Sequence, residues 1–267
     1  MRDSTEAKAQ KIFGERASFY TTSAVHTDPE VLGRVVAMAA PGPDWAVLDV
    51  GTGTGHTAFA LAPHTASVIG MDLTPEMLAE AERLRSERSV PNVTFRAGDA
   101  HRLPFGDGTF HLVTCRRAAH HFSDIRLALR EMRRVLRPGG RLVIDDRSVP
   151  EDEGVDRLMN LMDFYHDESH VREYRPSEWR RMLGAAGFAV EAVAPYDLHR
   201  PITSLTDGVS EANVRKIQET LNGLTDSQRA IFNLIEKDGQ LHFNHWFVMV
   251  SAQNEDGCER RLVWTTS

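Results

Sequence analysis

The chain has 267 residues, of which 41% are hydrophobic and 26% charged, and this composition excludes a wholly disordered protein and suits one α/β domain with insertions. Lys and Arg total 31 against 38 Asp and Glu, so the net charge of −7 disfavours nucleic acid and anionic membranes as partners. No apolar run approaches the roughly 20 residues of a membrane helix, and no signal peptide is evident. Cys115 and Cys258 form no CxxC pair, so we expect a soluble protein of the reducing cytoplasm.

Two helices are predicted ahead of the main domain. Apolar positions recur at helical spacing in residues 5–20 and 28–39, and Asp28 followed by Pro29 is typical of a helix start. We therefore expect residues 1–43 to form an N-terminal helical cap.

From residue 44 onward, strand patterns alternate with helical patterns. The apolar runs AVLDV, ASVIGM, VTFRAG, FHLVTC and RLVIDD are followed later by FAVEAVAP and QLHFNHWFVMVSAQ. Such alternation implies right-handed crossovers and helices on both faces of a parallel sheet. The sequence predicts an α/β fold, a Rossmann-like and mostly parallel seven-stranded sheet over residues 44–253.

Two segments interrupt this alternation. Residues 150–176 are first acidic and then rich in aromatic residues and histidine, whereas residues 197–240 are polar with helical patterns at 211–223 and 225–236. Both are predicted to be inserted helical lids over the strand ends, where ligands of open α/β sheets bind. Residues 254–267 are predicted to be a polar tail.

The strongest local signal is the run VLDVGTGTG, in which a buried strand enters a glycine-rich turn at a helix start. Gly51 and Gly53 allow the backbone to approach a ligand closely, and the amides of a helix start favour polar or anionic groups. A dinucleotide fingerprint requires glycine or alanine at position 56, where this chain has His56. The turn is therefore less suited to a pyrophosphate.

Two further acidic residues follow the next two strands. Asp72 stands about 20 residues after the turn, where a carboxylate accepts hydrogen bonds from both ribose hydroxyls of an adenosine. Asp99, between Gly98 and Ala100, can accept from the adenine amine. Each acid alone is more simply read as a helix cap or turn residue, but three markers on successive strand ends predict one adenosine-binding crevice.

The run from residue 44 to 148, including VLDVGTGTGH, GMDLTPEML, VTFRAGDAHRLPFGDGTF and VLRPGGRLVI, resembles the class I S-adenosylmethionine-dependent methyltransferases. The resemblance is strongest to the ubiquinone- and menaquinone-biosynthesis-like branch of small-molecule enzymes. It implies that Asp49 lies near the methionine amino group, that Asp72 holds the ribose and that Arg116 lines the methionine end. The full set of cofactor residues that it implies is Asp49, Gly51, Thr52, Gly53, Asp72, Leu73, Met77, Gly98, Asp99, Ala100 and Arg116.

Two histidines follow the fourth strand, where a methyl acceptor is expected. Either His120 or His121 can serve as a general base near neutral pH. The alternatives are that they cap the next helix or pack structurally, and that catalysis relies on positioning alone.

Two further histidine pairs have spacings that metal ligands can adopt. His166 and His170 are four residues apart, and His242 and His245 are three apart, but no third ligand is evident, so no metal is predicted. The aromatic residues of the cap and the lid segments suit an aromatic or hydrophobic small-molecule acceptor.

The predicted function is transfer of a methyl group from S-adenosylmethionine to O, N or C of a small molecule, with release of S-adenosylhomocysteine. One alternative is a non-methylating or regulatory protein that binds the same cofactor. The other is an NAD(P)-dependent oxidoreductase, which shares the Asp72 position but not the glycine spacing. The sequence leaves the acceptor, the methylated atom and the oligomeric state open.

Overall fold

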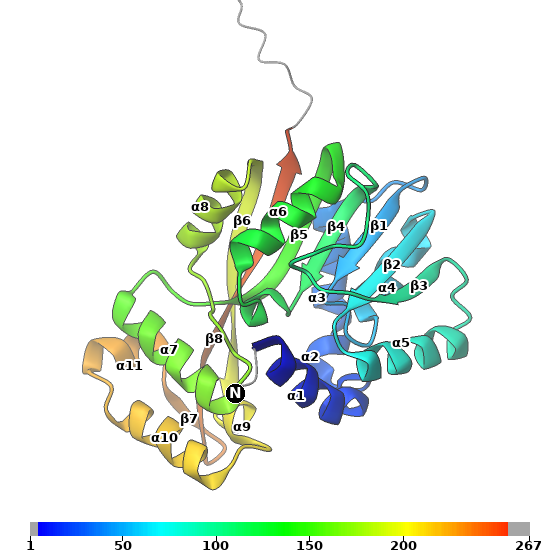
Figure 1. Ribbon diagram of the computed structural model, residues 1–267. Helices are drawn as coiled ribbons and strands as arrows, with labels where there is room; N and C mark the ends of the chain where they lie inside the picture. The colour runs from blue at the N-terminus through cyan, green and yellow to red at the C-terminus, as the bar shows by residue number, and fades with distance from the viewer. Residues whose placement is uncertain (1–4, 256–267) are drawn as a thin grey trace, which may run out of the picture.

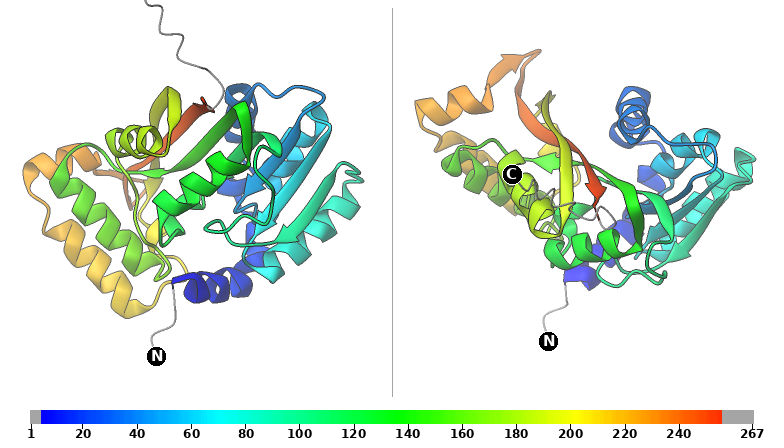
Figure 2. Two further views of the ribbon diagram at one scale, coloured as in Figure 1. Left: turned by 45° about the horizontal axis from the view of Figure 1, so that its top comes forward. Right: turned by 90° about the horizontal axis from the view of Figure 1, so that it is seen from above.

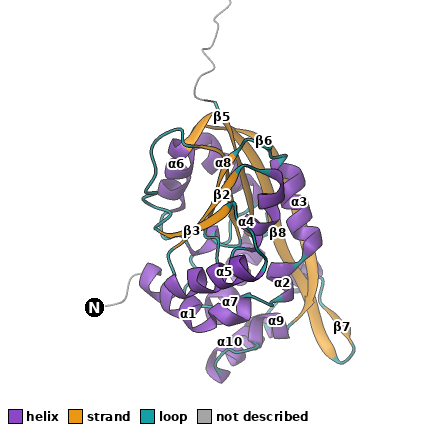
Figure 3. Ribbon diagram, turned by 90° about the vertical axis from the view of Figure 1, so that its right-hand side faces the viewer, coloured by secondary structure: helices purple, strands orange, loops and turns teal. Residues whose placement is uncertain are grey.

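The computed structural model describes residues 5–255 and contains one large sheet in the strand order β3-β2-β1-β4-β5-β8-β6 (Figure 1). Strands β1 to β5 are parallel, and β8 runs antiparallel to both of its neighbours, β5 and β6. The predicted mostly parallel seven-stranded sheet is therefore confirmed, with a short strand β7 (Ile235–Lys237) added as a hairpin on β8 (Figure 3). The seven strands are β1 (Ala46–Val50), β2 (Ser67–Asp72), β3 (Val93–Ala97), β4 (Phe110–Arg116), β5 (Leu136–Ser148), β6 (Phe188–Pro201) and β8 (Gln240–Asn254).

Helices cover both faces of the sheet, because alternate strand residues point to opposite sides. On one face, Val35 and Leu61 pack with Val47, while on the other face Met132 and Trp179 pack with Leu48. The first face carries α3 (Pro29–Ala39), α4 (His56–Leu61), the 3₁₀ turn η1 (Ala62–His64) and α5 (Pro75–Glu87), and the second carries α6 (Ile125–Val135) and α8 (Pro176–Ala185).

The helices predicted at residues 5–20 and 28–39 agree closely with the structure, whereas the helical pattern predicted at 225–236 is wrong at its end, because the helix stops at Phe232 and β7 begins at Ile235. Asp28 caps α3 by accepting a hydrogen bond of 2.9 Å from the Glu30 amide. The chain after α6 differs from the prediction, because β5 already begins at Leu136, ahead of the predicted strand run RLVIDD. The side-chain amide of Asn254 donates to the carbonyl of Leu136 at 2.9 Å, and this contact could not be inferred from the local sequence.

The lid segments form a small helical layer with its own apolar core, in which Met159, Met162, Ile217, Leu221 and Phe232 are buried together. Strands β6 and β8 are long and carry this layer beyond the rest of the sheet (Figures 1 and 3). Strand β6 therefore continues into the segment predicted as an insertion. The lid helices are α7 (Glu153–His166), α9 (Thr203–Thr206), α10 (Glu211–Asn222) and α11 (Asp226–Phe232).

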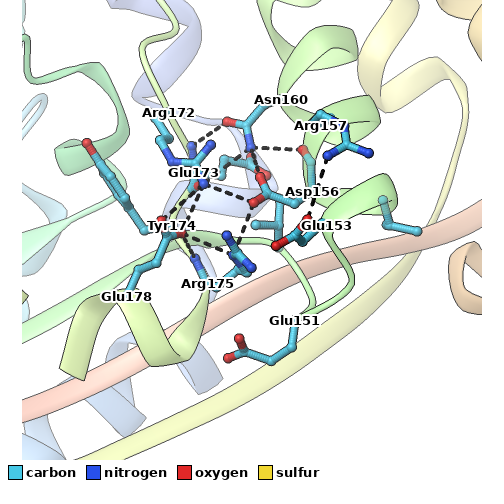
Figure 4. Close-up of polar contacts among 12 residues, drawn as sticks. Glu151, Glu153, Asp156, Arg157, Asn160, Arg172, Glu173, Tyr174, Arg175 and Glu178 are labelled. Carbon is cyan, nitrogen blue, oxygen red and sulfur yellow. Dashed lines mark hydrogen bonds and ion pairs between the residues drawn. The ribbon is translucent and has the colours of Figure 1, made fainter. Parts of the chain in front are cut away.

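An ionic cluster attaches α7 to the start of α8 (Figure 4). The buried carboxylate of Asp156 lies 2.9 Å from Nη2 of Arg172 and 3.1 Å from Nε of Arg175. Glu178 pairs with the same two arginines, and Asn160 also donates to Asp156 at 2.8 Å. Each charge of this cluster has an opposite partner, and the ion pairs connect α7 with the segment that leads into α8.

The N-terminal helices α1 (Thr5–Tyr20) and α2 (Ala24–Thr27) lie at the carboxyl edge of the parallel strands, between the lid and α5 (Figures 1 and 2). Helix α1 packs against α5, and Nε2 of Gln10 donates to the carbonyl of Leu73 at 3.0 Å. In the described part of the chain, none of the helices combines the length and apolar character needed to cross a bilayer. The polar tail predicted for residues 254–267 is wrong at its first residue, because Asn254 belongs to β8, and Cys258 with the rest of the tail from residue 256 onward lies outside the described residues.

Candidate active site

The glycine-rich turn joins β1 to α4 and lies against the end of β4. Gly51 has a φ of +67°, and a Cβ there would stand 2.5 Å from the Cβ of Ala118. Gly53 has a φ of +52°, and a Cβ built on it meets no atom within 4 Å. The turn therefore needs glycine at the first position for close packing and at the second for its backbone conformation, and it presents bare backbone to open space.

Asp72, at the end of β2, supports the turn from the neighbouring strand. Its Oδ2 accepts a 2.8 Å hydrogen bond from the Gly53 amide, and its Oδ1 accepts one of 2.9 Å from the Thr74 amide. Burial raises the pKa of Asp72, while these backbone hydrogen bonds oppose the rise. Each carboxylate oxygen keeps a further acceptor position, so the predicted contact with two ribose hydroxyls is chemically open.

The structure places Asp49 behind the turn instead of on the cavity wall. Its carboxylate oxygens accept hydrogen bonds of 2.7 Å from the hydroxyls of Thr52 and Thr114. Burial raises the pKa of Asp49 to about 6, against the effect of these two hydrogen bonds. Asp49 therefore holds the hydroxyl of Thr52 in the turn, and the contact with a methionine amino group implied by the resemblance stays a prediction.

The predicted adenine end is formed by the segment after β3 and the start of α5. Asp99 uses Oδ1 to accept from the amide of His101 at 2.8 Å and to contact its Nδ1 at 2.7 Å. Met77 and Ala100 are buried beside it, and Leu73 lies next to them in the same wall. An apolar slot with one acidic edge is the environment expected for an adenine ring.

Arg116, the last residue of β4, brings a buried cation to the other end of the crevice. Its Nε donates to Oγ1 of Thr57 at 2.9 Å, and its Nη2 donates to the carbonyl of His26 at 2.8 Å. Its Nη1 is buried and lacks a hydrogen-bond partner among the described residues. A buried guanidinium with an unused donor beside a cavity is suited to binding a carboxylate.

These elements enclose one cavity of about 990 Å³, including its open mouth, which we call the glycine-turn cavity. Except for Asp49, all the predicted cofactor residues line it, as does His121. The lining residues predicted from sequence are Gly51, Thr52, Gly53, Asp72, Leu73, Met77, Gly98, Asp99, Ala100, Arg116 and His121.

A second cavity, here called the lid cavity, lies between the N-terminal helices, the end of β4 and the lid, and measures about 1680 Å³ including its mouth. The two cavities share five lining residues, Phe13, Tyr20, His26, Arg117 and His121. The four rings among them form a continuous series, with centroids 4.8 Å apart for His121 and Phe13, 5.9 Å for Phe13 and Tyr20, and 4.8 Å for Tyr20 and His26. We call this series the ring partition.

The two predicted catalytic histidines have different surroundings. Nδ1 of His120 lies 2.6 Å from Oδ1 of Asp146, and His120 lines only the lid cavity of the two. Nδ1 of His121 lies 3.2 Å from the carbonyl of Ser169, which can only accept a hydrogen bond. We therefore place the His121 proton on Nδ1, which leaves Nε2 free to accept a proton.

The four histidines of the two spaced pairs each contact a different protein group. His166 contacts the carbonyl of Leu205, His170 contacts Asn160, His242 contacts the carbonyl of Gln240, and His245 contacts Ser204. Across residues 5–255, the His, Cys, Asp and Glu side chains include no group of three arranged to hold a metal ion.

The sequence predictions assigned no role to several residues of the cavities, among them His26, Arg117 and Arg200. Arg117 follows Arg116 in a strained backbone conformation with a φ of +55°, and its Nε donates to Asp145 at 3.2 Å. His26 lies on a four-residue helix without a recognisable motif. Arg200 stands near the end of a long strand and reaches the lid cavity only through the fold.

The sheet order and the chemistry at its carboxyl edge define a Rossmann-like α/β protein of the class that binds an adenosine-containing cofactor. A family model described as a methyltransferase domain matches residues 48–144. The uncharacterized methyltransferase YcgJ of Bacillus subtilis (strain 168) is 37% identical over 231 residues, covering 85% of this chain and 91% of that protein. A demethylmenaquinone methyltransferase of Thermus thermophilus is 35% identical over 189 residues, covering 63% of this chain and 80% of that protein.

Solved structures agree with the sequence comparison. The crystal structure of YcgJ matches with a TM-score of 0.80 and 35% identity, covering 85% of this chain and 98% of that one. A putative methyltransferase from Bacillus halodurans matches with a TM-score of 0.80 and 31% identity, covering 84% and 98%. The chain belongs to the class I S-adenosylmethionine-dependent methyltransferases, so the oxidoreductase alternative is set aside.

The residues of the glycine-turn cavity fit S-adenosylmethionine. The unpartnered Nη1 of Arg116 suits the carboxylate of the amino-acid end, and Asp72 suits the ribose hydroxyls. The bare backbone at Gly53 leaves space where a side chain would intrude. The cavity thus offers a cation, Arg116, for the amino-acid end of the cofactor and an anion, Asp72, for its ribose.

Proposed function

We propose that the protein transfers a methyl group to O, N or C of a small molecule that enters through the lid cavity. The observation that carries this proposal is that the glycine-turn cavity and the lid cavity share the ring partition as a common wall. When bound in the glycine-turn cavity, S-adenosylmethionine supplies an electrophilic methyl group and leaves as S-adenosylhomocysteine. An acceptor in the lid cavity would then meet the cofactor at the partition.

The protein contributes to this reaction chiefly by positioning. The ring partition and the lid restrict where an acceptor atom can lie, and holding two reactants in line can supply much of a rate enhancement. His121 is the only one of the two predicted catalytic histidines that lines both cavities. We assign to its Nε2 the acceptance of the proton that an acceptor hydroxyl, amine or acidic carbon releases.

Calorimetric titration with S-adenosylmethionine, S-adenosylhomocysteine and NADH tests the proposed cofactor cavity. We expect the first two to bind and NADH not to bind, because the turn lacks the third glycine of the dinucleotide fingerprint. Screening of small-molecule acceptors by mass spectrometry for a 14-dalton gain, the mass of one added CH₂ group, then identifies the methylated product. Binding of NADH alone, or cofactor binding without turnover on any acceptor class, would contradict the proposal.

The role of His121 is tested with the acceptor found by that screen. His121→Ala is expected to lower kcat by about 100-fold or more, the usual range for loss of a general base, with little change in S-adenosylhomocysteine affinity. The exposed His64, which lines neither cavity, provides the control variant His64→Ala. An unchanged kcat in His121→Ala, with the same pH profile as the native enzyme, would show that positioning alone drives the reaction.

A further inference from the structure

We propose that the acceptor carries a negatively charged oxygen group, a carboxylate or a phosphate, and that Arg200 binds this group in the lid cavity. The inference rests on the proposed function, since it names the chemical class of the acceptor. It starts from a half-buried arginine that has no counter-ion among the residues the structure describes.

Arg200 lies near the end of β6, opposite Phe243 in the β6–β8 ladder, and lines the lid cavity. Its side chain forms no hydrogen bond or ion pair with any residue in 5–255. The two arginines whose charges act on Arg200 each have a carboxylate partner. Arg147 pairs with Asp163 at 2.8 Å, and Arg117 pairs with Asp145 at 3.2 Å. Arg200 therefore contributes an uncompensated positive charge to a partly enclosed space.

The electrostatic surroundings of Arg200 are cationic. Burial, together with the charges of Arg147 and Arg117, lowers the pKa of the Arg200 guanidinium. Burial also lowers the pKa of His26 and of His245, and Arg200 and Arg117 add to both effects. Such a concentration of positive potential costs free energy in the free protein, and an anionic ligand would relieve it.

The acidic residues of the lid cavity do not neutralise Arg200. Asp163 is engaged by Arg147, and Oδ1 of Asp167 accepts hydrogen bonds from the amide of Ser169 at 2.8 Å and from its hydroxyl at 2.6 Å. Glu15 and Asp207 are exposed to solvent, which weakens their action on a group inside the cavity. The planar guanidinium of Arg200 thus keeps its fork of donors available, a geometry matched to carboxylate and phosphate oxygens.

The remaining wall of the lid cavity is suited to the rest of such an acceptor. Phe13 and Tyr20 line it at the ring partition, and Phe247 lies under the guanidinium of Arg117 at 3.8 Å. An acceptor with an anionic end on Arg200 and an apolar or aromatic body can therefore extend toward the partition. Fixing one end of the acceptor in this way would orient the opposite end toward the cofactor.

The proposal is tested by titrating the full chain with four probes: benzoate, phenyl phosphate, inorganic phosphate and benzamide, which is the neutral counterpart of benzoate. Each titration is made with and without saturating S-adenosylhomocysteine. The variants are Arg200→Gln, which removes the charge, Arg200→Lys, which keeps it, and Arg215→Gln, which removes an exposed arginine of α10. Circular dichroism and the affinity for S-adenosylhomocysteine establish that each variant is folded.

We expect at least one anionic probe to bind the native protein about tenfold or more tightly than benzamide, because charged hydrogen bonds exceed neutral ones. Arg200→Gln should lose about that factor, Arg200→Lys should lose less, and Arg215→Gln should bind as the native protein does. Preference for benzoate or for the two phosphates then identifies the anionic group. Should Arg200→Gln bind the anions as well as the native protein does, should benzamide bind as tightly as every anionic probe, or should no anion bind, the inference is overturned.

The same experiment separates this inference from the proposed function. If S-adenosylhomocysteine binds while the anions show no dependence on Arg200, the cofactor cavity stands and only the acceptor class is wrong. If S-adenosylhomocysteine fails to bind, the proposed function is wrong, and the titrations without it still determine whether Arg200 forms an anion site.

Discussion

Asp72→Ala is expected to weaken the binding of S-adenosylhomocysteine by about 100-fold. The estimate corresponds to about 2.7 kcal/mol, which is less than two full charged hydrogen bonds at about 1.5–3 kcal/mol each. The structure adds a second cause, because the Asp72 carboxylate also holds the amides of Gly53 and Thr74 at 2.8 and 2.9 Å. Its removal would therefore loosen the turn as well as delete the predicted ribose acceptor.

The matched variants for this prediction are Asp72→Asn and Asp44→Ala. Asp72→Asn keeps one acceptor oxygen but loses the charge, so its affinity should lie between those of the native protein and Asp72→Ala. Asp44 is exposed and lines neither the glycine-turn cavity nor the lid cavity, so its replacement should leave the affinity unchanged. Isothermal titration calorimetry measures all three, and an unchanged affinity in a folded Asp72→Ala protein would refute the assignment of the cofactor cavity.

Arg116→Gln is expected to weaken S-adenosylhomocysteine binding by about 10-fold to 100-fold, since one charged hydrogen bond to its carboxylate is lost. The probe that isolates this contact is 5′-methylthioadenosine, which has the adenosine but lacks the amino-acid end. Its affinity should be nearly the same in the native protein and in the variant. The difference between the two ligands measures the contribution of the unpartnered Nη1.

Arg116 also supports the fold, because it donates to Thr57 and to the carbonyl of His26. A thermal melt therefore accompanies the titration, and Arg116→Lys provides a second variant that keeps the charge. Lysine cannot reproduce the planar fork of donors, so partial loss of affinity is expected. Equal weakening of both ligands would mean that Arg116 shapes the cavity without contacting the carboxylate.

Much of the fold could be predicted because its determinants are local. The alternation of apolar strands and helical patterns requires parallel strands with crossovers, and it led to the correct sheet. The glycine turn and the acids Asp72 and Asp99 follow successive strands. In a parallel sheet these strand ends lie at the same carboxyl edge, so the three features come together there. These residues were found from sequence for that reason.

The orientation of the Asp49 side chain could not be predicted from the sequence. Its position in the first motif is evident from sequence, but its carboxylate is taken up by hydroxyls of Thr52 and Thr114, the second lying 65 residues away. That pairing follows from the alignment of β1 with β4, in which Asp49 stands opposite Thr114. Only the register of the two strands determines whether the side chain faces a ligand or the sheet interior.

The sequence by itself determined the family, the sheet and the cofactor class, because short motifs at strand ends carry that information. Only the tertiary structure determined the ring partition, in which α1 and α2 bring Phe13, Tyr20 and His26 against His121. It likewise determined that Arg200 reaches the lid cavity without a counter-ion from residues 5–255. These residues share no period or motif, since their proximity arises from the packing of the cap and lid segments around one cavity at the carboxyl edge of the sheet.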